Sequence, residues 1–257
     1  MQLNLTGQRV VIFGAAKGIG RAIAESFHSE GCHVTGFDRD NTKPPLHTVG
    51  DIVTGDVADL ATVQAFAAQQ TDVDHIVYSV GVGSGKFGFP FWNIDPADWA
   101  RVLEINLIGA VNVAHAFAPR MAERQHGSFS FLVSVAGQIG SQTDPPYSAA
   151  KAGLINFMHC VARDLAPHGV RANAISPGMV RTELNQSVWA AGQATLAPEA
   201  RLDYTEWAET KIRQVSPLGQ WQTPAEFAAM AVFLASDHAK NITGQTLNID
   251  GGQVMHA

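Results

Sequence analysis

The first forty residues alternate between strand-like and helix-like patterns around a glycine-rich turn. The apolar run 9–13 is followed by GAAKGIG at 14–20 and then by apolar residues at helical spacing up to Phe27. Gly31 predicts the end of this helix, and a second strand-like run follows at 33–37. This order predicts a β-α-β unit with parallel strands and a right-handed crossover.

The same alternation continues along the chain. Strands are predicted at 52–55, 75–80, 128–135, 170–175 and 245–249, and helices at about 59–69, 96–124, 147–166 and 224–236. Strands separated by helix-length segments predict a doubly wound α/β fold, in which helices cover both faces of a parallel sheet of about seven strands. The segment 40–45 is too short to separate two domains, so we expect residues 1–257 to form one domain.

The stretch at about 183–223 interrupts the alternation. Two weakly helical pieces occur here without a strand between them, and four aromatic residues lie among polar ones: Trp189, Tyr204, Trp207 and Trp221. Exposed aromatic residues mark ligand pockets as readily as they mark interfaces. We interpret the stretch as a small helical lid over a substrate, and the alternative is a surface excursion that packs for stability or against another subunit.

Charge and cysteine content exclude several classes of partner. The net charge of -6 gives no basic field for nucleic acid or for a membrane surface. No apolar run reaches the ~18 residues of a membrane span, and residues 1–6 do not resemble a signal peptide, so we expect a cytoplasmic protein. Cys32 and Cys160 have no paired spacing and no second ligand at metal spacing, so we expect reduced thiols and no metal site.

The turn at 14–20 is suited to a pyrophosphate. Gly14, Gly18 and Gly20 allow backbone N–H groups to approach it, and the helix that follows adds the positive end of its dipole. The spacing G-x-x-x-G-x-G is weak evidence alone, because a tight turn without a ligand is the alternative. Asp38 lies 18 residues after Gly20, near the ~20-residue offset of a carboxylate that binds ribose hydroxyls. The two features together predict a dinucleotide site.

Later motifs resemble those of the short-chain dehydrogenase/reductase family, and the resemblance covers nearly the whole chain. The segment YSAAK at 147–151 resembles the family's Y-x-x-x-K pair, a serine stands 13 residues earlier, and an asparagine lies in INLIG at 105–109. The resemblance implies a catalytic set of Asn106, Ser134, Tyr147 and Lys151. It also implies cofactor contacts at Gly14, Lys17, Gly18, Ile19, Gly20, Asp38, Arg39, Asp56, Val57, Ser79, Gly81, Tyr147, Lys151, Pro177, Gly178, Val180 and Thr182.

The spacing of Tyr147 and Lys151 itself predicts acid/base chemistry. Residues four apart share a helix face, so an ammonium beside the phenol should favour the phenolate. A fall in a tyrosine pKa from ~10 to ~7 requires about 4 kcal/mol, which one charge about 4 Å away supplies at an effective dielectric constant of about 20. We expect Tyr147 to act as general acid/base and Ser134 to orient the substrate oxygen. A serine-nucleophile triad is not supported, because no histidine lies at a suitable strand end.

Asn106 and two departures from the family's usual sequence lead to further expectations. The resemblance implies that Asn106 perturbs its helix and holds a water linking the lysine to solvent, and the alternative is a hydrogen-bonded core amide. Phe13 stands where the family usually has threonine, and YSVG at 78–81 replaces N-N-A-G. Both departures concern support of the cofactor, not the reacting residues.

These features predict an NAD-dependent oxidoreductase that interconverts a secondary alcohol and a ketone. Asp38 favours NAD because its carboxylate would repel a 2′-phosphate, whereas Lys17 and Arg39 could attract one. The alternatives are an NADP-dependent 3-oxoacyl reductase and, from another class, a non-catalytic dinucleotide sensor, which would not need the acid/base pair.

The substrate and the assembly are less constrained. Aromatic residues suit an acyl or aromatic alcohol, whereas polar residues before Tyr147 suit a sugar or polyol, which we favour. The aromatic set is Phe87, Phe89, Phe91 and Trp92, and the polar set is Gln138, Gln142, Thr143 and Asp144. The family resemblance and a charged fraction of only 16% favour a homotetramer.

Overall fold

Seven strands form one parallel sheet in the order β3-β2-β1-β4-β5-β6-β7. The structure, a computed structural model, describes residues 2–40, 52–86, 90–140 and 144–255. The strands are β1 Arg9–Phe13, β2 His33–Asp38, β3 Ile52–Thr54, β4 His75–Tyr78, β5 Gly127–Leu132, β6 Val170–Pro177 and β7 Thr246–Ile249. The predicted sheet is confirmed, although β4 and β5 end earlier than expected because residues 79–82 and 133–136 turn toward a pocket.

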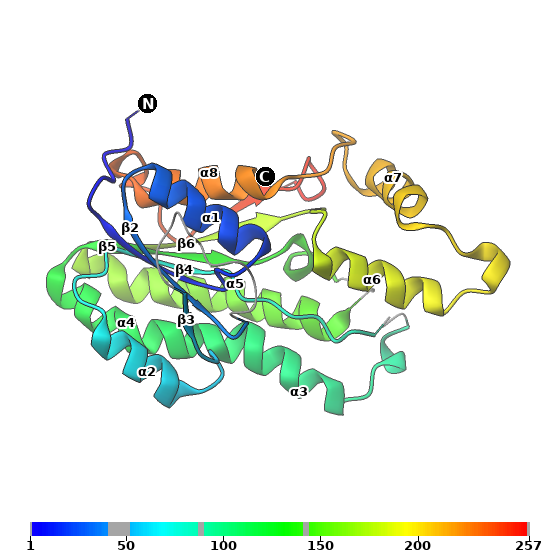
Figure 1. The fold of residues 1–257 in the computed structure, drawn as a ribbon, viewed down its shortest axis with the longest axis horizontal. Helices are drawn as coiled ribbons and strands as arrows, with labels where there is room; N and C mark the ends of the chain where they lie inside the picture. The colour runs from blue at the N-terminus through cyan, green and yellow to red at the C-terminus, as the bar shows by residue number, and fades with distance from the viewer. Residues whose placement is uncertain (1, 41–51, 87–89, 141–143, 256–257) are drawn as a thin grey trace.

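Helices cover both faces of this sheet (Figure 1). Helices α1 (Gly18–Ser29) and α8 (Pro224–Ala235) pack together on one face. Helices α2 (Leu60–Gln69), α4 (Gly109–Arg124) and α5 (Pro145–Leu165) cover the other. The doubly wound arrangement is therefore confirmed.

The side chains of β1 alternate between the two layers. Val11 and Phe13 pack on the side of α2, α4 and α5, and Val10 and Ile12 pack on the side of α1 and α8. A strand buried on both faces reads as a continuous apolar run, which is what the sequence has at 9–13. The Phe13 ring contacts the rings of Phe37, Phe66 and Phe117, so this position supports the core instead of supplying a hydroxyl.

The helix predicted at 96–124 is not continuous. Helix α3 (Ala97–Leu103) passes into a π-helical segment, Glu104–Ile108, before α4 begins. Asn106 lies fully buried in this segment, and its Nδ2 donates to the Val102 carbonyl at 2.8 Å. That carbonyl is the acceptor that the Asn106 N–H would use in a regular α-helix, so the side chain accounts for the widened turn.

The run Ala97–Arg124 is long and apolar enough to cross a membrane by length and composition, and no other helix in the described part of the chain is. It packs against α2 and α5, and several of its apolar residues, among them Val113, Phe117 and Met121, belong to the core. We therefore treat it as a core element.

Two helices extend beyond the carboxyl edge of the sheet (Figure 1). They are α6 (Glu183–Ala194) and α7 (Tyr204–Val215), and they form the two helical pieces expected at 183–223. The ring of Trp189 on α6 meets that of Tyr204 on α7 with centroids 5.7 Å apart. A parallel bridge between Val180 and Gln222 joins the two ends of this excursion at its base.

Candidate active site

A pocket of about 1000 Å³ opens at the carboxyl ends of the central strands. It lies where the chain order reverses between β1 and β4, which is where ligands bind in doubly wound sheets. Its volume is at the upper end of the roughly 300–1,000 Å³ typical of small-molecule sites. All predicted cofactor contacts line it, from Gly14 in the first turn to Thr182 at the start of α6. Of the predicted catalytic residues, Ser134, Tyr147 and Lys151 line it and Asn106 does not.

The glycine-rich turn has no space for side chains at two of its three glycines. A Cβ on Gly20 would lie 2.0 Å from the Gly14 carbonyl oxygen, and one on Gly14 would lie 2.9 Å from the backbone of Ser79. Lys17, the N-cap of α1, makes no side-chain capping hydrogen bond. The first N–H groups of α1 are therefore not capped by this side chain, and they can receive an anion.

Asp38 connects the end of β2 to this turn. Its Oδ2 accepts from the Ala16 N–H at 2.9 Å and its Oδ1 accepts from the Asp40 N–H at 3.0 Å. Each carboxylate oxygen retains a further lone pair for a hydroxyl donor. Of the two nearby cations, Arg39 is exposed, whereas the Lys17 ammonium lies 2.6 Å from a carboxylate oxygen of Glu183 on α6.

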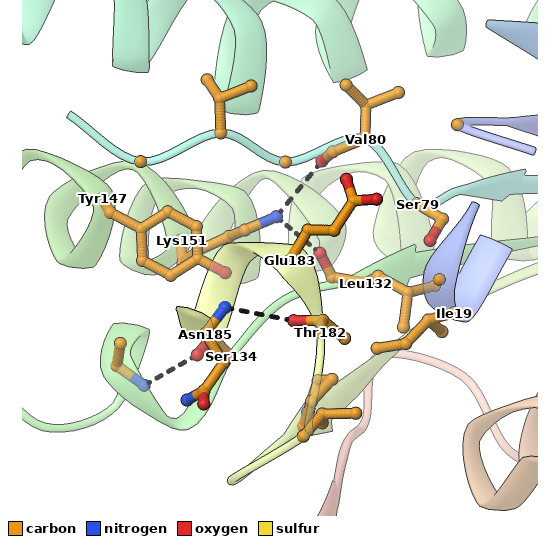
Figure 2. A pocket seen from close by; sticks show the side chains of 18 of the residues that line it. Ile19, Ser79, Val80, Leu132, Ser134, Tyr147, Lys151, Thr182, Glu183 and Asn185 are labelled. Atoms are coloured by element: carbon orange, nitrogen blue, oxygen red, sulfur yellow. Dashed lines mark hydrogen bonds between the residues drawn. The ribbon is translucent and has the colours of Figure 1, made fainter. Parts of the chain in front are cut away.

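Lys151 is a buried residue of the pocket lining (Figure 2). Its ammonium donates to the Leu132 carbonyl at 2.8 Å and to the Val80 carbonyl at 3.4 Å, and it lies 5.6 Å from the centroid of the Tyr147 ring. Burial lowers the pKa of this lysine to about 7. The residue can therefore gain or lose a proton near neutral pH.

Tyr147 differs from the expected phenolate-favouring environment. Burial raises the pKa of its phenol to about 12, and the Asp144 carboxylate acts in the same direction. The Ser134 hydroxyl, which hydrogen-bonds the phenol, acts against them. The loss of hydration therefore has a larger effect on the pKa of the phenol than the nearby Lys151 ammonium, which is itself buried and bonded to carbonyls.

Asn106 hydrogen-bonds to the backbone beside the pocket and does not line the pocket itself. Its Nδ2 donates to the Val82 carbonyl at 2.8 Å and its Oδ1 accepts from the Val82 N–H at 3.3 Å. A Cβ added to Gly81 would lie 3.4 Å from this Oδ1 and 3.5 Å from the Lys151 ammonium. The contacts are those of a hydrogen-bonded core amide that holds the strand-end loop next to Lys151.

The predicted substrate residues separate into three groups. Asp144 lines the pocket, whereas the Gln138 amide does not, because it donates to Ser176 Oγ at 2.6 Å and to Asn248 Oδ1 at 2.7 Å. Phe91 and Trp92 are exposed and lie outside the pocket lining. Phe87, Phe89, Gln142 and Thr143 lie outside the described residues.

Sequence reasoning named Trp207 in the proposed lid but missed the other residues of its two helices that line the pocket. Helix α6 contributes Asn185, Val188 and Gly192, and α7 contributes Trp207, Lys211 and Val215. Their spacing of three or four residues was visible in the sequence, but nothing there showed which face of either helix meets the pocket. Among the aromatic residues noted at 183–223, only Trp207 lines the pocket.

The part of the chain that the structure describes holds no cluster of three or more His, Cys, Asp or Glu side chains able to bind a metal ion. A glycine-rich turn, a strand-end carboxylate and a Tyr–Lys pair meet instead in one pocket. This combination on a doubly wound sheet defines an NAD(P)-dependent oxidoreductase.

Comparison with known proteins identifies the family. A family model described as enoyl-(acyl carrier protein) reductase matches residues 14–254. The chain is 34% identical over 254 residues to the acetoacetyl-CoA reductase of a Synechocystis species, covering 98% of each protein. It belongs to the short-chain dehydrogenase/reductase family.

Two further relatives show the range of the family around this chain. The 3-oxoacyl-[acyl-carrier-protein] reductase of Escherichia coli is 29% identical over 262 residues, covering 98% of this chain and all of that protein. A solved gluconate 5-dehydrogenase from Burkholderia cenocepacia, in complex with NADP and tartrate, superposes with a TM-score of 0.84 at 29% identity, covering 98% of this chain and 97% of that one. Acyl reductases and sugar-acid dehydrogenases are thus both similar to this protein.

Proposed function

We propose that this protein catalyses the NAD-dependent interconversion of a secondary alcohol and a ketone on a polar hydroxy compound. The observation that carries the proposal is the pairing of the Tyr147 phenol with the Ser134 hydroxyl, beside Lys151, in the pocket that also holds the glycine-rich turn. A dinucleotide sensor would need the turn but not this pair.

The residues divide the reaction between them. The first turn of α1 and Asp38 would hold the dinucleotide, whose nicotinamide supplies the hydride acceptor or donor. In the oxidation direction the ionised form of Tyr147, the phenolate, accepts the proton of the alcohol hydroxyl as the adjacent carbon loses its hydride. Ser134 holds the same oxygen, because its Oγ is fixed by the Ala136 N–H at 3.1 Å. Lys151, with a pKa of about 7, can pass a proton on near neutral pH.

The polar substrate is supported by Asp144 in the pocket wall and by the likeness to a gluconate 5-dehydrogenase. The alternative, a 3-oxoacyl or acetoacetyl-CoA reductase, is supported equally by the curated relatives. Turnover of sugar acids and polyols against acyl thioesters, followed by absorbance of the reduced cofactor, distinguishes the two. Reduction of thioesters alone would replace the proposed function with the alternative.

We expect NAD to be used in preference to NADP. The Asp38 carboxylate is fixed at the end of β2 by two backbone N–H groups and would face a 2′-phosphate with like charge. Asp38→Ser should lower the ratio of kcat/KM for NAD over NADP about 10- to 100-fold, the range of a hydrogen bond to a charged group. Steady-state kinetics with both cofactors measures this ratio. An NADP preference in the unchanged protein would contradict the assignment and favour Lys17 and Arg39 as phosphate ligands.

We also propose a cytoplasmic homotetramer in which each chain is one catalytic domain and residues 183–223 form a lid. The low charged fraction and the family support burial of surface between subunits. Sedimentation velocity should give one species near four times the chain mass of 27.4 kDa. A stable monomer at micromolar concentration would overturn the assembly.

A further inference from the structure

The two lid helices each present one face to the pocket. On α7 these residues are Trp207, Lys211 and Val215, which are four apart and therefore share a side of the helix. The remaining inward positions of α7, Ala208 and Ile212, are buried in the protein. Lys211 is thus the one charged residue on a helix face that is otherwise aromatic and aliphatic.

Lys211 differs from the other charged residues of α7. Glu206 forms a capping box with Asp203, and Arg213 pairs with Glu209 at 3.4 Å on the outer surface. Lys211 is half-buried, and it makes no ion pair or hydrogen bond with any residue in the described ranges 2–40, 52–86, 90–140 and 144–255. An ammonium without a protein partner at the wall of a pocket can pair with an anionic group of a ligand there.

The other cations that line the pocket have contacts or lie elsewhere. Lys17 pairs with Glu183, Lys151 bonds to two backbone carbonyls, and Arg181 stacks on the Trp221 ring at 5.2 Å. Arg39 lies beside Asp38 at the end of β2. Lys211 is therefore the lining cation that the lid offers to a ligand.

A carboxyl group, that of Asp144, also lines the pocket. Asp144 is buried at the start of α5, three residues before Tyr147, and its Oδ2 accepts from the Ser84 N–H at 2.8 Å. Within the described residues, which leave out 141–143, its Oδ1 has no hydrogen-bond partner. An anionic substrate would be repelled from this carboxylate and attracted by Lys211, so the two charges would orient it with its anionic end toward α7.

We propose that Lys211 binds an anionic oxygen group of the substrate, a carboxylate or a phosphate. The substrate would then be an anionic hydroxy or keto compound, such as a sugar acid, in place of a neutral polyol. This inference rests on the proposed function for the reaction, and it names the recognition element that selects the substrate.

The test compares anionic and neutral members of three matched pairs. Gluconate against sorbitol examines a carboxylate, glycerol 3-phosphate against glycerol examines a small phosphate, and acetoacetyl-CoA against ethyl acetoacetate examines the phosphates of a thioester. Each is assayed for kcat/KM with NAD(H) and NADP(H), and for binding through the intrinsic tryptophan fluorescence, to which Trp207 on the same helix face as Lys211 contributes. The variants are Lys211→Met, which keeps the aliphatic stem, Lys211→Arg, which keeps the charge, and Arg213→Met as a control on the outer side of α7.

We expect the unchanged protein to prefer the anionic member of at least one pair. Lys211→Met should lower kcat/KM for that member about 10- to 100-fold, as expected for a charge-assisted hydrogen bond, and change the neutral member by less than about threefold. Lys211→Arg should restore most of the loss, Arg213→Met should have no effect, and the Kd of the cofactor should not change in any variant.

The outcomes separate the two proposals. A Lys211 effect confined to acetoacetyl-CoA would support this inference while replacing the proposed substrate class. Turnover of neutral compounds without a Lys211 effect would overturn the inference and leave the proposed function standing. If no anionic member is turned over or bound more tightly than its neutral partner, the inference is wrong, and a weaker cofactor Kd in Lys211→Met would assign the lysine to the dinucleotide.

Discussion

Tyr147→Phe should lower kcat by at least about 100-fold and leave the Kd for NADH unchanged. The substitution removes only the hydroxyl that bonds Ser134 and that would transfer the proton, and loss of general acid/base catalysis is typically worth about 10² to 10⁴ in rate. Because burial and Asp144 hold the pKa of this phenol near 12, alcohol oxidation should accelerate as the pH rises toward that value. The variant should lose this rise.

Steady-state kinetics across pH and fluorescence titration with NADH measure both quantities. Tyr78→Phe is the matched control, because Tyr78 is buried and is not among the residues that line the pocket, and its hydroxyl donates to the Ile105 carbonyl. We expect this control to lose stability of about 1 kcal/mol and to keep its activity. If Tyr147→Phe retains more than about a tenth of the kcat, against the expected loss of ~10², Tyr147 is not the acid/base.

Lys151→Met should impair both steps, catalysis and cofactor binding. The side chain occupies a buried position of similar volume in either form, so the fold should remain. The Leu132 and Val80 carbonyls would lose their donor, which should lower the free energy of unfolding by about 1–3 kcal/mol. If the ammonium also bonds the nicotinamide ribose, as the family resemblance implies, the Kd for NADH should rise about tenfold or more while kcat falls by at least ~10².

The comparison with Ser134→Ala distinguishes this role from simple orientation of the substrate. Ser134 lines the pocket beside Tyr147, so its loss should lower kcat with little change in the Kd for NADH. Thermal unfolding of all three variants, monitored by circular dichroism, separates loss of fold from loss of chemistry. Unchanged NADH affinity in Lys151→Met would restrict the lysine to proton transfer and support of the loops.

Local patterns in the sequence were sufficient to predict the architecture of the fold. The alternation of apolar residues on β1 and the helical spacing after Gly18 depend on neighbours within a few residues, and these local preferences agree with the tertiary packing. The glycines of the first turn were also readable, because a Cβ at Gly20 would collide with the Gly14 carbonyl in any such turn. The four-residue spacing placed Tyr147 and Lys151 on one side of α5 and at one pocket.

Other features depend on contacts between distant segments, and only the tertiary structure decided them. The π-helical turn arises because Asn106 reaches back to Val102 and across to Val82, which is 24 positions away in the sequence. The Gln138 side chain donates to Asn248, which is 110 positions away in the sequence, and it does not line the pocket.

The electrostatic character of the site is likewise a tertiary property. The sequence placed an ammonium near the Tyr147 phenol, but burial sets the outcome by raising the phenol pKa and lowering that of Lys151. The inward orientation of Lys211 depends on how α7 packs over the pocket. Chain spacing determines which side chains can share a face, whereas hydration and distant partners determine what each side chain does there.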